Sequence, residues 1–297
     1  MPHVDAEMLP VPSTAQWVET AFAKVNLALH VRERRSDGYH ALESLFVFAE
    51  AGDRLSGHER FDGMVSLRVE GPFADALDAG PDNLVMKAAH ALQAHMREER
   101  GAAMVLTKNL PVASGIGGGS ADGAAALRLL VRLWNVDIAP EMLEEIALSL
   151  GSDVPACLAS VTQTVRGRGE LLQRQTVAGL PGTPMLLVNP GIGVSTARIF
   201  GAWDRIDRGP LRAADLAELI AEGRNDLEPP AMEAAPVIAD VLAALRSCEG
   251  VKLSRMSGSG ATCFALFDTD RHLAAAAVAL RARHGHWWIA ETRIRTE

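Results

Sequence analysis

The sequence predicts an α+β protein made of two domains. Its 297 residues exceed the usual domain size of about 100–150 residues, so two cores are expected. Segments with strand-like alternation and segments with helical spacing occur in both halves of the chain. They do not alternate strictly, as they would in a doubly wound parallel sheet. We therefore expect a mixture of sheet and helices in each half.

The N-terminal half begins with strands and continues through one helix to a glycine-rich loop. Residues 19–31 alternate as a strand does, and Asp37-Gly38 supplies the positive φ of a hairpin turn. Asp82 or Asn83 precedes an apolar stripe at helical spacing and is a suitable N-cap. We expect a returning strand with its exit turn at 42–55, a strand at 64–71, a helix at 82–98 and a strand at 102–109.

Helices predominate in the rest of the chain. A helix is expected from Ser120 to Asn135, and Pro140 and Gly151 mark the two ends of the next one. Further helical segments are 195–206, 211–223, 235–248 and 270–285. Strands are expected as a glycine-linked pair within 160–173, at 183–190, in the second part of 256–267 and at 286–294.

We divide the chain into a flexible N-terminal extension, residues 1–16, an N-terminal domain, 17–164, and a C-terminal domain, 165–297. The extension contains acids and prolines where a signal peptide would have a basic end and an apolar run.

Composition narrows the classes of partner. The formal net charge of −8 argues against binding to nucleic acid or to a membrane surface, because both require a basic face. A small-molecule ligand is therefore expected. Cys157, Cys248 and Cys263 lie far apart and have no paired spacing, which indicates neither a disulfide framework nor a zinc site and fits a reducing cytoplasm.

The stretch PVASGIGGGSADGAA, residues 111–125, raises the question of function. It contains five glycines within thirteen positions and joins a predicted strand to a predicted helix, an arrangement that can bind phosphate through free backbone N–H groups. A P-loop would have lysine directly after Gly119, and the dinucleotide fingerprint would have glycine at position 120, where this chain has Ser120. The motifs of protein kinases are also missing downstream. The residues alone indicate a phosphate-binding enzyme of small molecules, with a flexible connector as the alternative.

Three motifs together resemble those of the GHMP kinases. The spacing from Pro111 through Gly115 to Ser120 resembles their second motif, AFAKVNLALHV at 21–31 the first, and MSGSGATCFALF at 256–267 the third. The stretches RRSDGYHALESLF, GSDVPA, GRGE and NPG are similar to one branch, which phosphorylates the 2-hydroxyl of a cytidine diphosphate sugar alcohol on the non-mevalonate route to isoprenoid precursors. The resemblance implies a two-domain GHMP kinase fold, an N-terminal domain that binds ATP, an active site in the interdomain cleft, and Mg²⁺ arriving with ATP.

The resemblance selects Lys24 and Asp153 as the catalytic pair. Asp153 would accept the proton of the acceptor hydroxyl, while Lys24 would keep Asp153 ionised and stabilise the developing charge. For isolated residues the plainer interpretations are an exposed strand cation for Lys24 and a helix N-cap for Asp153.

The second motif is expected to bind ATP. Ser120 suits either a helix cap or a hydroxyl that contacts ATP, and the two roles are compatible. The family has a second serine where this chain has Ala121 and asparagine where it has Asp122, so contacts assigned to those positions are in doubt. No residue is assigned to a metal. The expected ATP-binding residues are Pro111, Gly115, Ile116, Gly117, Gly118, Gly119, Ser120 and Ala121.

The remaining candidates concern the acceptor. The resemblance implies that Tyr39 and His40 help to bind the cytosine, with Phe200 on the opposite face and Thr196 at a substrate contact. A hairpin cap is the alternative for Tyr39, a core position for Phe200, and a structural position for Asn26, which lies on the same strand face as Lys24. Gly258 and Gly260 permit a close approach to the first glycine loop or to substrate phosphate. The expected substrate-binding residues are Asn26, Tyr39, His40, Thr196, Phe200, Gly258 and Gly260.

Two other functions remain open from the sequence. One is a different GHMP small-molecule kinase, such as a homoserine kinase, although a small amino acid has no base to stack against Tyr39 and Phe200. The other is a non-catalytic nucleotide-binding protein on the same fold, against which the presence of both Lys24 and Asp153 argues.

Overall fold

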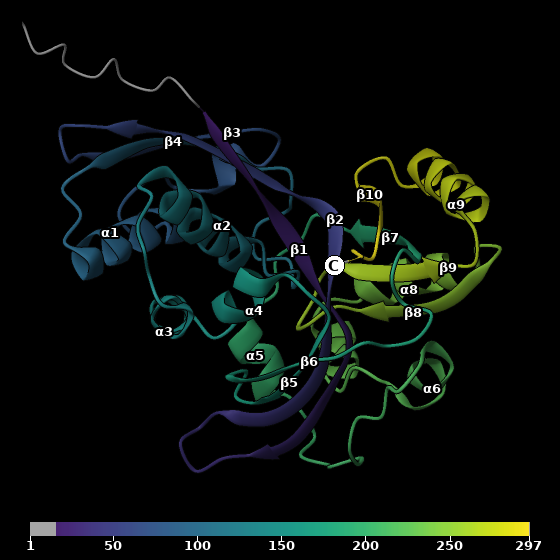
Figure 1. Ribbon diagram of the computed structural model, residues 1–297. Coiled ribbons are helices and arrows are strands. Elements are labelled where there is room, and N and C mark those ends of the chain that lie inside the picture. Colours follow the sequence, from purple (N-terminus) through teal and green to yellow (C-terminus); the bar gives the residue numbers. More distant parts are fainter. Residues whose placement is uncertain (1–15, 297) are drawn as a thin grey trace, which may run out of the picture.

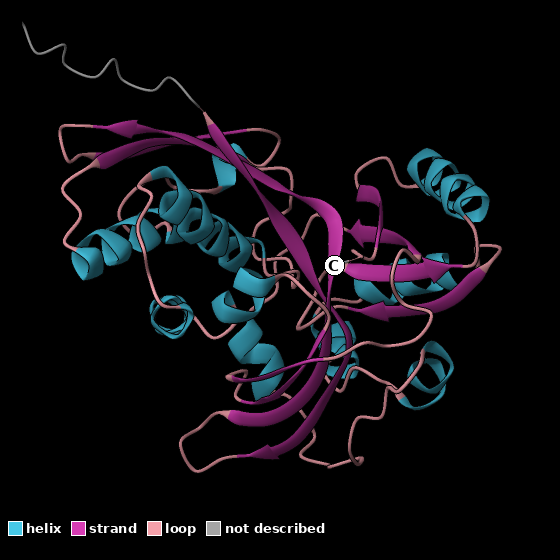
Figure 2. Ribbon diagram, viewed as in Figure 1, coloured by secondary structure: helices cyan, strands magenta, loops and turns pink. Residues whose placement is uncertain are grey.

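The computed structural model describes residues 16–296, so the predicted extension, residues 1–16, lies outside the described residues except for its last member. Two sheets form the centre of the molecule, with helices on the outer side of each (Figure 1). Figure 2 shows the same mixture of helices and strands in both halves of the chain.

A long hairpin organises the structure. Strand β1, Trp17–Arg34, pairs antiparallel with β2, His40–Arg60. The predicted turn between them is confirmed: Gly38 has φ of +85°, and Asp37 accepts a hydrogen bond from the Tyr39 N–H. The predicted exit turn near Asp53 is wrong, because β2 continues through it to Arg60.

Contacts with two distant segments of the chain explain why β2 continues past Asp53. A side chain at Gly52 would place its Cβ 2.4 Å from the Ala21 carbonyl oxygen, so glycine allows the strands to approach closely there. Asp53 is fully buried and accepts hydrogen bonds from the N–H groups of Asn109 and Leu110. Residues typical of a turn therefore serve inside a strand.

The first sheet contains six strands. The strands β3, Val65–Glu70, and β4, Gly101–Thr107, run parallel to each other, and β4 pairs with the second half of β2. The strands β5, Gln163–Gly167, and β6, Leu171–Arg174, extend the sheet from the first half of β2. The predicted domain boundary between residues 164 and 165 thus falls inside β5, a strand of the first sheet.

The second sheet is antiparallel, in the order β10-β7-β9-β8. The strand β8 was not expected from the sequence, because its apolar positions are interrupted by Lys252, Ser254 and Arg255. The four strands are β7, Pro184–Asn189; β8, Val251–Met256; β9, Cys263–Phe267; and β10, Trp288–Arg293.

The helices form two groups (Figure 1). Those packed with the first sheet are α1, Leu84–Met96; α2, Gly118–Leu133; and α4, Val154–Ala159, and α3, Pro140–Leu150, packs against these three helices. The helices α8, Val237–Arg246, and α9, Asp270–Arg283, pack on the second sheet. Shorter helices are η1, Ala74–Ala76; α5, Thr196–Gly201; α6, Leu216–Glu222; and α7, Glu228–Ala234. The sequence did not predict α7, whose first turn contains two prolines.

Strand alternation divides the core between the two layers. In β2, Phe46 and Phe48 point into the core shared with α1 and α2, whereas Leu45 and Val47 point into a core shared with the second sheet. The middle of β1 is buried along its whole length from Ala23 to Val31. A polar side chain on this part of β1 is therefore buried as well and requires polar partners.

Within residues 16–296, no helix combines the length and apolar character needed to cross a membrane. The same part of the chain contains no group of three or more His, Cys, Asp or Glu side chains placed to hold a metal ion. Cys157, Cys248 and Cys263 are all free thiols.

Candidate active site

A cavity of about 430 Å³ collects side chains from widely separated parts of the sequence. The first motif contributes Lys24 and Asn26, the glycine loop contributes Gly115 and the four residues from Gly117 to Ser120, and Asp153 lies at the start of α4. The third motif and α5 complete the wall. Residues from both halves of the chain therefore face one space, as a transfer between two bound molecules requires.

Lys24 and Asp153 form an ion pair in this cavity. The Lys24 ammonium lies 3.1 Å from Asp153 Oδ2, with 6% of the lysine side chain and 31% of the aspartate side chain exposed. Asp153 occupies the N-cap position of α4 but makes no capping hydrogen bond with its side chain. Lys24 is buried, not an exposed strand cation, and it also lies over the ring of Phe46. The interpretation of Lys24 as an exposed strand cation is therefore wrong, whereas Asp153 does occupy the expected N-cap position but leaves its carboxylate free for Lys24.

Asn26 connects the pair to its surroundings. Its side-chain oxygen accepts a hydrogen bond from the Lys24 ammonium at 2.9 Å, and its amide donates to Ser44 Oγ at 2.9 Å. Its backbone N–H donates to Ser257 Oγ. Because Ser44 also donates to the Ala28 carbonyl, the orientation of Asn26 is fixed, and with it the position of the lysine.

The glycine loop leads directly into α2. The helix begins at Gly118, two residues before the predicted start, so Gly118, Gly119 and Gly123 have helical conformation. Of the five glycines in this stretch, Gly115 and Gly117 have positive φ, of +81° and +62°. A Cβ at Gly117 would lie 3.0 Å from Lys24 Cε, so glycine allows the loop to pass close to the catalytic candidate. The first turn of α2 leaves N–H groups without helical acceptors, which suits a nucleotide phosphate.

The third motif supports this loop from behind. A Cβ at Gly115 would lie 2.5 Å from the Ser257 carbonyl oxygen and 2.7 Å from that of Gly260. Ser257 Oγ donates to the Gly115 carbonyl, and the Thr262 N–H donates to the Ser114 carbonyl. Gly258 and Gly260 were expected to permit a close approach either to the first glycine loop or to substrate phosphate. The structure shows the approach to the glycine loop.

A buried charged cluster, Lys108 with Asp53 and Asp122, lies beneath the start of α2. The Lys108 ammonium donates to Asp122 at 2.6 Å and also to Asp53, and it would lie 3.1 Å from a Cβ at Gly118. Burial raises the pKa of Asp122 to about 7, and its Oδ1 has no hydrogen-bond partner among residues 16–296. The cluster joins β2 and the segment after β4 to the first turns of the helix.

Aromatic residues gather at another side of the cavity. The ring of His40 packs against Phe200 at a centroid distance of 5.2 Å and against Trp203 at 5.8 Å. Burial and the nearby Arg34 lower the pKa of His40, which favours the neutral ring. Tyr39 is 60% exposed, and the Arg168 guanidinium lies 5.3 Å from its ring centroid. Phe200 both lines the cavity and packs against the apolar core that α8 forms with the second sheet.

Not every residue expected at the site faces the cavity. Thr196 does, and its hydroxyl lies 2.9 Å from that of Ser259. Pro111, Ile116 and Ala121 are buried behind the glycine loop. The expected residues on the cavity wall are Lys24, Asn26, Gly115, Gly117, Gly118, Gly119, Ser120, Asp153, Thr196, Phe200 and Gly258, whereas Pro111, Ile116, Ala121, Tyr39, His40 and Gly260 do not line it.

Sequence reasoning missed several contributors. Arg168, in the β5–β6 turn, lines the cavity, although RGRGE was interpreted only as a hairpin. Asp53 looked like part of a turn, and Lys108 had no recognisable partner at a fixed spacing. The only available signal for Arg168 was that GRGE is one of the stretches that carry the family resemblance.

Comparison with known proteins decides the family. The model described as "GHMP kinases N terminal domain" matches residues 83–160, and that described as "GHMP kinases C terminal" matches 210–286. The chain belongs to the GHMP kinases. The predicted GHMP kinase fold and the predicted class of activity, an ATP-dependent small-molecule kinase, are thereby confirmed.

Within the GHMP kinases, similar proteins share one description. The chain is 48% identical over 279 residues to the 4-diphosphocytidyl-2-C-methyl-D-erythritol kinase of Rhizorhabdus wittichii, covering 93% of this chain and 94% of the relative. It is 49% identical over 284 residues to the kinase of that description from Ruegeria pomeroyi, covering 92% and 97%.

Solved structures agree with this placement. A crystal structure of 4-(cytidine 5'-diphospho)-2C-methyl-D-erythritol kinase is similar to this chain with a TM-score of 0.75 and 33% identity, covering 93% of this chain and 99% of that one. A homoserine kinase from Cytophaga hutchinsonii shares the fold, with a TM-score of 0.71 at 16% identity, covering 97% and 98%.

Proposed function

We propose that the chain transfers a phosphoryl group from ATP to the 2-hydroxyl of 4-diphosphocytidyl-2-C-methyl-D-erythritol, with Asp153 as the general base and Lys24 as its electrostatic partner. The observation that carries this proposal is the Lys24–Asp153 ion pair at 3.1 Å, on the wall of the cavity that the glycine loop also lines. The relatives described as kinases of that compound support the choice of acceptor.

Each of the proposed site residues has a separate role in the transfer. Asp153 accepts the proton of the attacking hydroxyl and orients its oxygen, while Lys24 places a positive charge where negative charge accumulates during transfer. The glycine loop and the start of α2 bind the phosphates of ATP. Mg²⁺ arriving with ATP would supply further positive charge at those phosphates. Asn26, fixed by Ser44 and Ser257, keeps the lysine in position.

The aromatic side of the cavity is suited to the cytosine. Phe200 offers a face to a base, His40 supports Phe200 from behind, and the exposed Tyr39 lies on the neighbouring hairpin turn. Base stacking on such side chains contributes about 1–3 kcal/mol for each base. This contribution separates a cytidine-linked acceptor from a plain polyol or an amino acid.

The proposal is tested with a panel of acceptors. Purified protein is incubated with MgATP and, separately, with 4-diphosphocytidyl-2-C-methyl-D-erythritol, homoserine and mevalonate, and phosphorylated product is followed by ³¹P NMR. We expect product only with the first compound. Phosphorylation of homoserine or mevalonate instead would reassign the acceptor, and the absence of product with all three would refute the proposed acceptor and point to a different small molecule.

A further inference from the structure

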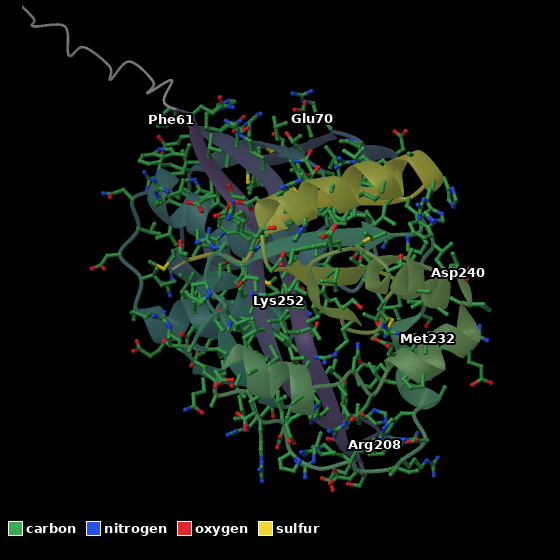
Figure 3. All side chains as sticks on the ribbon, turned by 90° about the vertical axis from the view of Figure 1, so that its right-hand side faces the viewer. Phe61, Glu70, Arg208, Met232, Asp240 and Lys252 are labelled. Atoms are coloured by element: carbon green, nitrogen blue, oxygen red, sulfur yellow. The ribbon has the colours of Figure 1, made fainter. Side chains whose placement is uncertain are left out.

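A second cavity, of about 530 Å³, lies in the C-terminal half of the chain. It has no lining residue in common with the candidate active site. Its walls come from the segment after α5, from residues 223–226 after α6, and from α7, α8 and β8. Figure 3 looks onto this half of the molecule and labels Arg208, Met232 of α7 and Lys252 of β8. The volume is in the range of small-ligand sites.

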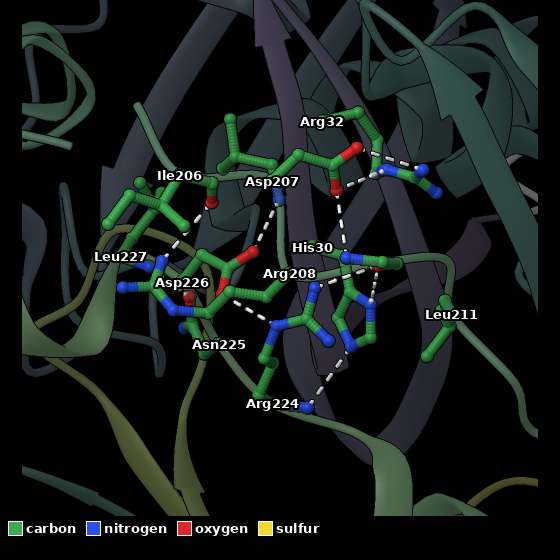
Figure 4. A network of polar contacts seen from close by, with 12 residues as sticks. His30, Arg32, Ile206, Asp207, Arg208, Leu211, Arg224, Asn225, Asp226 and Leu227 are labelled. Atoms are coloured by element: carbon green, nitrogen blue, oxygen red, sulfur yellow. Dashed lines mark hydrogen bonds and ion pairs between the residues drawn. The ribbon is translucent and has the colours of Figure 1, made fainter. Parts of the chain in front are cut away.

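Four arginines and four carboxylates line this cavity, so its formal charges balance. Three of the arginines are paired. Arg224 donates to Asp226 at 2.8 Å, Arg246 to Glu228 at 3.2 Å, and Arg208 to Asp204. Figure 4 shows the part of this network around Arg224, Asp226 and Arg208.

Arg255 is the exception. It lies on β8, is 8% exposed, and within residues 16–296 forms no ion pair. Its one hydrogen bond in this part of the chain runs from Nη1 to the Leu27 carbonyl oxygen, at 2.6 Å. Burial lowers the pKa of Arg255 to about 10, which leaves the side chain charged at neutral pH. A buried charge without a partner is costly, and an anion in the cavity would offset that cost.

The carboxylates nearby are already engaged. Asp226 accepts hydrogen bonds on both oxygens, from Arg224 and from the Val31 N–H. Glu228 likewise accepts from Arg246 and from the Met256 N–H. Both carboxylates are thus occupied by other donors. The negative charge of Glu228 favours the charged form of Arg255, but within residues 16–296 Glu228 forms no ion pair or hydrogen bond with it.

Of the other two carboxylates, Asp204 accepts from Arg208 on both oxygens. Glu233 is exposed on α7, where water solvates it. The charge left over inside the cavity is thus the positive charge of Arg255.

We propose that this cavity is a binding site for a small anion, a phosphate or carboxylate group of a metabolite, held by the guanidinium of Arg255. A guanidinium presents a planar fork of donors that matches two oxygens of such a group. Ser254, on the same strand, also lies on the cavity wall.

The position of the site connects it to the third motif. Asn225, on the cavity wall, donates to the carbonyl oxygens of Met256 and Gly258, each at 2.8 Å. Gly258 in turn lines the candidate active site. An anion on Arg255 would therefore lie beside the groups that hold this loop in place.

The test measures binding, so it does not depend on the proposed reaction. The full chain is first saturated with Mg²⁺, a non-hydrolysable ATP analogue and a cytidine diphosphate acceptor, which fill the candidate active site. Inorganic phosphate, pyrophosphate and malonate are then titrated separately by calorimetry. We expect one further site per chain for at least one probe, and comparison of the phosphate and malonate titrations identifies the preferred group.

Variants locate the site. Arg255→Gln should weaken the binding by at least about tenfold. Arg255→Lys, which keeps the charge and a donor for Leu27 but loses the planar fork, should weaken it less. Arg281→Gln is the matched control, because Arg281 is exposed on α9 and pairs with Glu291 away from both cavities.

Two results would overturn the proposal: no binding of any probe up to about 10 mM, or equal affinity in the wild type and in Arg255→Gln. If the glutamine variant fails to fold, the site can be tested by anomalous diffraction from crystals of the wild type grown with selenate. An anomalous peak within hydrogen-bond distance of the Arg255 guanidinium supports the site, and its absence refutes the site.

Discussion

Replacing Asp122 by asparagine should change how the stability of the protein depends on pH. Asp122 is buried with an unpartnered Oδ1, and burial raises its pKa from 3.8 to about 7. Between these two values the native state holds a proton that the unfolded chain has lost. The free energy of unfolding therefore falls as pH rises through this interval, by about 1.4 kcal/mol for each pH unit at most.

Between pH 5 and pH 7 this effect amounts to about 2–3 kcal/mol. Asparagine has nearly the same shape and does not titrate, and Lys108 keeps its partner Asp53. The variant should thus lose this part of the slope and gain stability relative to the wild type as pH rises. Chemical denaturation at pH 5, 6, 7 and 8 measures the difference, and subtraction of the two curves removes the contribution of the histidines.

Asp62→Asn provides the matched control. Asp62 is exposed, and its hydrogen bonds with Arg60 and the Met64 N–H lower its pKa to about 2, so it stays ionised throughout the interval. The control should run parallel to the wild type. If Asp122→Asn also runs parallel to the wild type from pH 5 to pH 7, the raised pKa of Asp122 is refuted.

Two further predictions concern the acceptor and the glycine loop. Tyr39→Ala should raise the KM for the cytidine acceptor by about 5- to 150-fold, the equivalent of about 1–3 kcal/mol of stacking, and should change the KM for ATP much less. Steady-state kinetics measures both KM values. A change confined to the KM for ATP would contradict the assignment of Tyr39 to the cytosine. Gly115→Ala should lower the thermal unfolding temperature, because its Cβ would lie 2.5 Å from the Ser257 carbonyl oxygen. Gly119→Ala is the control and should unfold at nearly the temperature of the wild type, because the nearest atom to its Cβ would be 3.7 Å away. Equal unfolding temperatures for the two variants would argue against the close approach of the glycine loop and the third motif.

Much of the fold follows from local patterns in the sequence. The turn at Asp37-Gly38, the Asn83 cap of α1 and Pro140 at the start of α3 act through their own backbone geometry, so they can be recognised without the rest of the chain. The continuation of β2 through Asp53 could not be predicted in this way. It depends on N–H donors more than fifty residues away, at Asn109 and Leu110.

In the candidate site, too, some features follow from local sequence and others depend on contacts between distant segments. Lys24 and Asn26 share a strand face by their spacing alone, and the glycine loop is visible as a strand-to-helix connection. The approach of Asp153 to Lys24 and the support of Gly115 by Ser257 are contacts between distant segments. Only the resemblance of several motifs brought these residues together before the structure did, and it did not reveal that Lys108 is held between two aspartates.

The most direct test of the proposed mechanism is the turnover of Asp153→Asn with MgATP and 4-diphosphocytidyl-2-C-methyl-D-erythritol. Asparagine keeps the shape of the side chain but cannot accept the proton, so kcat should fall by about 10²- to 10⁴-fold, while the affinity for a non-hydrolysable ATP analogue stays nearly unchanged. Asp137→Asn, an exposed position outside the cavity, should retain the activity of the wild type. A kcat of Asp153→Asn within a few-fold of the wild type would contradict the role of Asp153 as the general base.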